Sequence, residues 1–122
     1  MVFSGIFFED VDASHKYIKE VLEAPRAAED LKNELLEKLD YLKENPYSRP
    51  LVHDEFLASL GVRSIKVKTH LIFYGIECNG GDDKLVNIFR FMYSKRNWMS
   101  ILREKPLRYS NSSGLAPKPV RP

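Results

Sequence analysis

Five cationic side chains lie in or beside strand-like runs in the second half of the sequence: Arg63, Lys66, Lys68, Lys95 and Arg96. Guanidinium and ammonium groups bind phosphate and carboxylate oxygens, so these residues are candidates for binding an anion or an acidic partner. Lys95 and Arg96 follow Ser94, which the pattern predicts as the cap of a last helix. A cation in a first helical turn is disfavoured by roughly 0.3 to 1 kcal/mol, so a pair there favours a binding site. The alternative is that these common surface cations only keep the protein soluble.

His70 and Tyr93 could add acid–base chemistry to this surface, because imidazole and phenol groups donate and accept protons. Together with Lys66 and Arg96, which would stabilise charge on a scissile phosphate, they would form a metal-independent ribonuclease site. A lone histidine near a strand start is more often structural, so the residues leave both readings open. The chain has no CxxC, HExxH, phosphate-binding glycine loop or GxSxG motif, and we expect no metal or cofactor.

The charges are divided unevenly along the chain. Residues 1–60 contain seven Lys and Arg against thirteen Asp and Glu, a net charge of −6, whereas residues 61–122 contain twelve against four, a net charge of +8. The overall charge of +2 hides this division. A basic half indicates nucleic acid, the ribosome or an acidic protein segment as a partner.

Length and composition indicate one cytoplasmic domain. A chain of 122 residues with 43% hydrophobic and 30% charged residues is large enough for one core and too apolar for wholesale disorder. Cys78 has no partner for a disulfide and is interpreted as an incidental reduced thiol. The acidic N-terminal segment is not a secretory signal, and no apolar run is long enough to span a membrane.

The first half predicts a helix hairpin. Residues 2–8 are short and apolar and predict a strand, and a helix is expected from Asp12, capped by Asp12 or Ser14. Pro25 ends this helix and begins a second one, which continues to Asn45. The second helix has an apolar stripe at helical spacing, formed by Ala28, Leu31, Leu35, Leu39 and Leu42.

The second half predicts an antiparallel meander. Its strands are residues 62–68, 70–76 and 85–93, with a turn at 78–83, and a short helix follows at 94–102. The fold class is therefore α+β, with a helix hairpin packed on a small antiparallel sheet and a short C-terminal helix.

Two further expectations concern single features of this half. Arg90, placed on the face of Val86, Ile88 and Met92, is expected to be partly buried and paired with a carboxylate or carbonyl.

Residues 1–103 form the expected domain, and residues 104–122, rich in proline, are expected to be a disordered tail.

The order of these elements resembles the toxins of type II toxin–antitoxin modules, the RelE/ParE superfamily, also known as plasmid stabilisation proteins. The resemblance is carried by PRAAEDLKNELLEKLDYLKENP, LGVRSIKVKTHLIFY and IFRFMYSKRNW, and covers about residues 13–102. It implies a compact toxin held inactive by a cognate antitoxin whose tail wraps the sheet and a basic groove. The family usually has a longer first helix than this N-terminus is expected to form.

The resemblance implies two possible mechanisms. RelE-like toxins cleave mRNA on the ribosome, and ParE-like toxins inhibit DNA gyrase. Lys66 and Arg96 match basic positions of the ribonucleases, but Leu71 and Leu102 stand where those proteins carry an arginine and a tyrosine. This favours gyrase inhibition. An mRNA endonuclease using Tyr93, Arg96, Lys66 and His70 remains the alternative, and a degenerate module that only binds antitoxin is a third.

Overall fold

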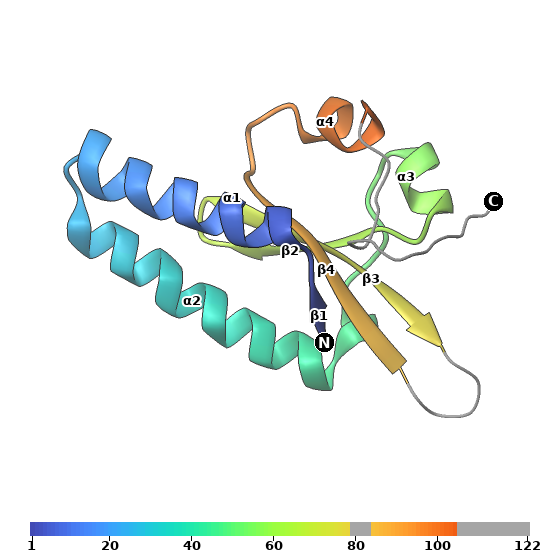
Figure 1. Ribbon diagram of the computed structural model, residues 1–122. Helices are drawn as coiled ribbons and strands as arrows, with labels where there is room; N and C mark the ends of the chain where they lie inside the picture. Colours follow the sequence, from blue (N-terminus) through green and yellow to red (C-terminus); the bar gives the residue numbers. More distant parts are fainter. Residues whose placement is uncertain (79–83, 105–122) are drawn as a thin grey trace.

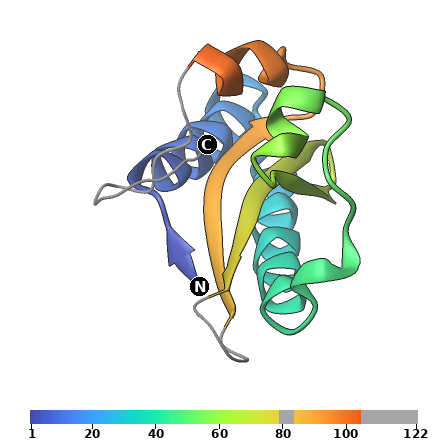
Figure 2. The ribbon, with the colours of Figure 1, turned by 90° about the vertical axis from the view of Figure 1, so that its right-hand side faces the viewer.

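A computed structural model describes residues 1–78 and 84–104 of the chain. Two long helices pack on one face of a four-stranded sheet, and two short helices lie at the other face (Figures 1 and 2). This arrangement confirms the predicted α+β class. The predicted turn falls mainly on residues 79–83 and the predicted disordered tail mainly beyond Glu104, and these parts lie outside the described residues.

The sheet has the order β1-β4-β3-β2. Its strands are β1 (Val2–Phe3), β2 (Arg63–Val67), β3 (His70–Cys78) and β4 (Lys84–Tyr93). The last three form the predicted antiparallel meander. The short β1 runs parallel to β4, so the complete sheet is mixed rather than antiparallel. β2 is one edge of the sheet, with β3 as its neighbour.

The N-terminal prediction was wrong beyond Phe3. Residues 2–8 do not form one strand, because α1 (Gly5–Lys16) begins within them. Ser4 caps this helix, and its hydroxyl accepts a hydrogen bond from the amide of Phe7 at 3.0 Å. The aromatic run has high β propensity, but helical geometry places Phe7 in the core with only 2% of its surface exposed. The first helix is therefore longer than expected.

The helix hairpin was predicted correctly. A π-helical turn, η1 (Tyr17–Val21), extends the first helix, and α2 (Pro25–Glu44) begins with the predicted proline at its first position. α1 and α2 run side by side over the sheet (Figure 1). The predicted leucine stripe of α2 faces the strands, with Leu31, Leu35 and Leu42 buried.

The second face of the sheet is covered by two short helices, α3 (Glu55–Ser59) and α4 (Trp98–Glu104). They lie close together at one end of the sheet (Figure 2). α3 was not predicted, because its segment looked irregular. α4 begins four residues later than the predicted start at Ser94. The side chains buried at this face are Val52, Leu57, Val62, Phe73, Phe89, Met92 and Leu102.

A β-bulge divides β4 into two halves. Tyr74 pairs with Ile88 and Phe73 pairs with Arg90, so Phe89 is the extra residue. The bulge turns Arg90 to the face of its partner Phe73, away from Ile88, so the expectation that Arg90 and Ile88 share a face was wrong. A Cβ atom on Gly75 would lie 3.0 Å from the Phe89 ring, so a larger residue at this position would require the bulged side chain to shift.

Candidate functional site

The sheet register decides which predicted site residues face the same side. His70 pairs with Val67 on one side and with Tyr93 on the other, which brings His70 and Tyr93 together. Lys66 pairs with Leu71 in the next row of the sheet. Successive residues of a strand point to opposite faces, so Lys66 lies on the opposite face from His70 and Tyr93.

His70 is built into the protein interior. Only 6% of its surface is exposed, and its ring stacks on Phe91 with centroids 4.8 Å apart. Its Nδ1 lies 3.0 Å from the hydroxyl of Thr69, and its Nε2 lies 3.1 Å from the hydroxyl of Ser14. Burial lowers the pKa of His70 below its ordinary value. The residue is thus neutral over a wider pH range and fully hydrogen-bonded, which is the pattern of a structural histidine.

Tyr93 is the more accessible of the two, with 46% of its surface exposed and its ring 5.8 Å from that of His70. A turn follows it, in which the Ser94 amide donates to Thr69 and the Arg96 amide donates back to Tyr93. Lys95 and Arg96 lie exposed in this turn, before α4 begins.

The helix-dipole argument for Lys95 and Arg96 was therefore wrong. Neither residue lies in a first helical turn, since the amides of residues 94 and 96 are held by carbonyls of the turn and of Thr69. The two cations remain close in sequence to Tyr93 at one end of β4. Both precede α4, so their presence alone does not indicate a site.

Two of the other predicted cations already have partners within the chain. Lys68 occupies the turn after β2 with a φ of 52°, where Glu34 of α2 accepts from its backbone amide at 2.9 Å and lies 3.7 Å from its ammonium nitrogen. The guanidinium of Arg63 donates to the carbonyl of Arg49 and lies 5.4 Å from the centre of the Tyr47 ring. Both side chains hold the fold around β2.

Lys66 belongs to a hollow of about 450 Å³ beside the edge strand β2. Six residues line it: Glu37, Lys38, Tyr41, Arg49, Ile65 and Lys66. The cations come from α2, from the segment after η2 (Pro46–Ser48) and from β2. Among the described residues, none of these three cations forms an ion pair.

Sequence reasoning missed Lys38 and Arg49. Neither occurs in a motif, and each is far from Lys66 along the chain. Only the packing of α2 against β2 brings the three cations to one hollow. The pattern gave no signal for this beyond ordinary surface charge.

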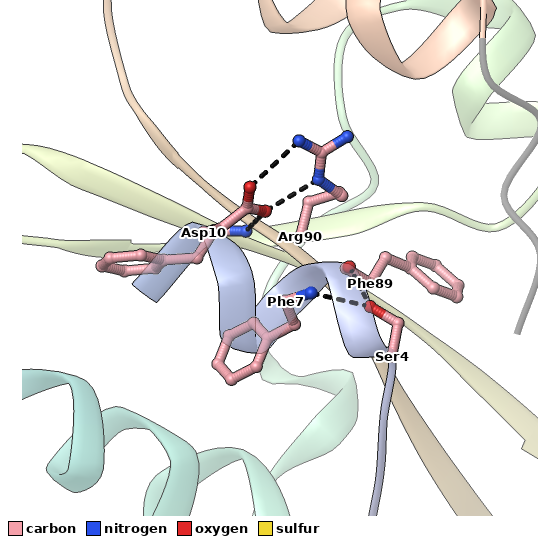
Figure 3. A network of polar contacts seen from close by, with 6 residues as sticks. Ser4, Phe7, Asp10, Phe89 and Arg90 are labelled. Carbon is pink, nitrogen blue, oxygen red and sulfur yellow. Dashed lines mark hydrogen bonds and ion pairs between the residues drawn. The ribbon is translucent and has the colours of Figure 1, made fainter. Parts of the chain in front are cut away.

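Arg90 has the role that was expected of it. Its guanidinium makes two hydrogen bonds to Asp10 of α1, at 2.7 and 3.0 Å, and the same carboxylate accepts from the Phe91 amide at 3.0 Å (Figure 3). The side chains of Arg90 and Asp10 are only 13% and 11% exposed. The pair ties α1 to the bulge, so Arg90 is not available for binding a ligand.

Residues 2–98 match the family model described as the ParE toxin of the type II toxin-antitoxin system, parDE. The chain belongs to the ParE toxin family. The match confirms the resemblance to the RelE/ParE superfamily and includes the N-terminal strand and helix. No curated protein matches the chain.

Membership of the ParE toxin family implies a cognate antitoxin as a partner. Within residues 1–78 and 84–104, no group of three or more His, Cys, Asp or Glu side chains is placed to hold a metal ion. No helix in the same part of this ParE chain is long and apolar enough to cross a membrane.

A second ion pair holds the short helices of the ParE fold together. Asp54 accepts from the Leu57 amide at 3.0 Å, which caps α3, and also accepts hydrogen bonds from the guanidinium of Arg103 in α4. The hydrogen bonds from Arg103 and then the one from Leu57 lower the pKa of Asp54. Sequence reasoning missed this pair because α3 was not expected.

Proposed function

We propose that this ParE toxin arrests growth by inhibiting DNA gyrase without hydrolysing a substrate, and that its cognate antitoxin neutralises it. The toxin would act in the cytoplasm, where it would meet both DNA gyrase and the antitoxin. The cationic residues would then act in binding rather than in bond cleavage.

The observation that carries the proposal is the distribution of the candidate ribonuclease residues over the sheet. General acid–base catalysis needs its groups within hydrogen-bond reach of the same reacting atoms. His70 is buried behind Ser14 and Phe91, and Lys66 lies on the opposite face from His70 and Tyr93. Leu71, which pairs with Lys66, offers no charge to a phosphate. These positions support a binding toxin over a nuclease.

One observation favours the alternative, a ribosome-dependent mRNA endonuclease. Tyr93 is exposed beside His70, and Arg96 follows in the next turn. If this toxin cuts mRNA, Arg96→Ala abolishes the cuts while the protein stays folded. Unchanged cleavage by that variant removes Arg96 from the mechanism.

Induced expression of the full chain distinguishes the readings. Gyrase inhibition predicts trapped gyrase–DNA cleavage complexes and a DNA damage response. Ribonuclease action predicts codon-positioned cuts in ribosome-bound mRNA, and a degenerate module that only binds antitoxin predicts neither. Damage without mRNA cuts supports the proposal, and mRNA cuts without cleavage complexes overturn it.

A further inference from the structure

We propose that residues 105–122, together with the exposed side chains of Lys95 and Arg96, bind the phosphates of duplex DNA. The toxin would then contact the DNA that gyrase holds as well as the enzyme itself. This inference rests on the proposed function, because gyrase is the target that would bring the toxin to duplex DNA.

The first support is the division of charge between the domain and the segment that follows it. Residues 1–104 contain fifteen Lys and Arg against seventeen Asp and Glu, a net charge of −2. Residues 105–122 contain four Lys and Arg and no Asp or Glu, a net charge of +4. The positive net charge of the chain therefore comes from this last segment. A segment that carries cations alone is attracted to a polyanion.

The second support is a repeated basic motif in the same segment. The tetrapeptide Lys-Pro-x-Arg occurs at residues 105–108 and again at residues 118–121, with Leu and Val at its third position. Proline restricts the backbone between the two cations, which lowers the entropy lost on binding. Bound in a polyproline II form, which has three residues per turn, both cations of one motif would face the same side. Each motif would thus present a pair of cations to a row of phosphates.

The third support is that the described structure fixes the start of this segment. α4 ends at Glu104, and Leu102 of that helix is buried with 2% of its surface exposed. The guanidinium of Arg103 donates hydrogen bonds to Asp54, whose side chain is only 6% exposed. Residues 105–122 therefore leave the domain from a fixed point. DNA bound by them would stay near the domain, which raises its effective concentration there.

Lys95 and Arg96 lie close to this point. Both are exposed in the turn before α4, and the Arg96 amide donates to the carbonyl of Tyr93 at 3.0 Å, which helps to fix the turn. α4 has seven residues and is therefore only about 10 Å long. The turn and the start of the segment thus lie at the two ends of one short helix (Figure 2). One duplex could contact both.

Duplex DNA fits these observations better than an acidic peptide does. An exposed ion pair between protein side chains contributes only about 0 to 1 kcal/mol, so isolated carboxylates would hold such a segment weakly. DNA carries about one negative charge per 1.7 Å of its axis, and each phosphate that a cation neutralises releases condensed counterions. Binding should therefore be independent of base sequence and strongly dependent on salt.

The test measures fluorescence anisotropy of a fluorescein-labelled duplex of about thirty base pairs with the full chain, between 50 and 200 mM salt. The tail variant combines Lys105→Gln, Arg108→Gln, Lys118→Gln and Arg121→Gln. We expect it to bind at least tenfold more weakly at 50 mM salt. The slope of log affinity against log salt should become less negative by roughly 3 to 4, because each phosphate contact contributes about 0.9. Lys95→Gln with Arg96→Gln should change the slope by roughly 2.

The matched control removes the same charge from another surface. The helix variant neutralises four exposed cations of η1 and α2 by Lys19→Gln, Arg26→Gln, Lys32→Gln and Lys43→Gln. We expect its affinity to remain within threefold of the native value and its salt slope to be unchanged. This control separates the position of the cations from the net charge of the protein.

Four results would overturn the proposal. They are no measurable binding of the duplex, native affinity in the tail variant, an equal loss in the helix variant, and displacement of the duplex by polyglutamate at the same concentration of charge. The last result would favour an acidic peptide as the ligand. Tighter binding of a single-stranded RNA of the same length would also overturn it, in favour of RNA.

Supercoiling assays on the same proteins keep this inference separate from the proposed function. If both hold, the tail variant should need at least fivefold more protein than the native chain for half-inhibition of gyrase. Duplex binding that depends on the tail, in a chain that leaves gyrase active, supports the DNA contact and contradicts the gyrase target. Gyrase inhibition without such duplex binding does the reverse.

Discussion

The junction of α1 with β4 and the open edge of β2 use charged residues in opposite ways. At the junction, Asp10 and Arg90 are nearly buried and satisfy one another, and the same carboxylate also holds a backbone amide (Figure 3). At the edge, Lys38, Arg49 and Lys66 line a hollow and have no ion-pair partner among the described residues. The two regions thus differ in pairing and burial: the charges of the junction are satisfied within the protein, whereas the cations of the hollow have no carboxylate partner in the described chain.

The largest effect is expected at the junction. In Asp10→Ala, Arg90 keeps its charge in a nearly buried position without a partner, which typically costs about 3 to 5 kcal/mol. We expect the free energy of unfolding, measured by urea denaturation, to fall by an amount in this range.

A double variant, Asp10→Ala with Arg90→Met, is the control for this prediction. It removes the unpaired charge and should recover part of the loss, although the Phe91 amide still lacks its acceptor. A single variant as stable as the native chain would show that the pair is not structural and would remove the contrast with the edge.

The helix cap at Ser4 gives the next largest effect. Its hydroxyl accepts from the Phe7 amide and donates to the carbonyl of Phe89 at 2.6 Å, so it links α1 to the bulge. Ser4→Ala should lower the free energy of unfolding by roughly 0.5 to 2 kcal/mol. Ser94, which looks like a cap in the sequence but precedes a turn, is the matched control, and Ser94→Ala should change stability by less than about 0.5 kcal/mol. Equal losses in the two variants would contradict this assignment.

The Asp54–Arg103 pair predicts a dependence on acid. The pKa of Asp54 is lowered in the folded chain, so its contribution to stability is complete above about pH 4, the ordinary range of the carboxyl, and is lost as the pH falls through the folded-state value. Urea denaturation between pH 7 and pH 2 should therefore show a smaller acid-dependent loss in Asp54→Asn than in the native chain. Asp40→Asn, an exposed acid of α2 without an ion pair in the described residues, should keep the native profile. Identical profiles for all three proteins would rule out this role for Asp54.

The smallest effect on stability is expected at the β2 edge. Arg49→Ala and Lys66→Ala remove exposed side chains that form no ion pair in the described chain, and each should change the free energy of unfolding by less than about 0.5 kcal/mol. A stability loss comparable to that of Asp10→Ala would show that these cations are structural.

Strong periodicity made most of the fold predictable. The leucine stripe of α2 and the alternating or continuous apolar runs of β2, β3 and β4 gave the elements and the order of the meander. The N-terminus was misread because an aromatic run has β propensity in isolation, whereas the cap at Ser4 and burial of Phe7 decide for a helix. The start of α4 was misread because a serine can precede a turn as well as a helix.

The candidate site was less predictable for a different reason. The sequence identifies cations but does not say which of them the fold will pair. Lys68 and Arg63 prove to be engaged with Glu34 and with the carbonyl of Arg49, and Lys95 and Arg96 lie in a turn rather than in a helix. The hollow at β2 depends on residues from three separate segments, which only tertiary packing brings together.

DNA supercoiling by purified gyrase tests the central claim most directly. The full chain, added in excess to gyrase and relaxed plasmid, is predicted to inhibit supercoiling and to increase cleaved DNA, and it should leave ribosome-bound mRNA intact. Unchanged supercoiling in the presence of the toxin, together with cutting of ribosome-bound mRNA that Tyr93→Phe abolishes, would contradict the account.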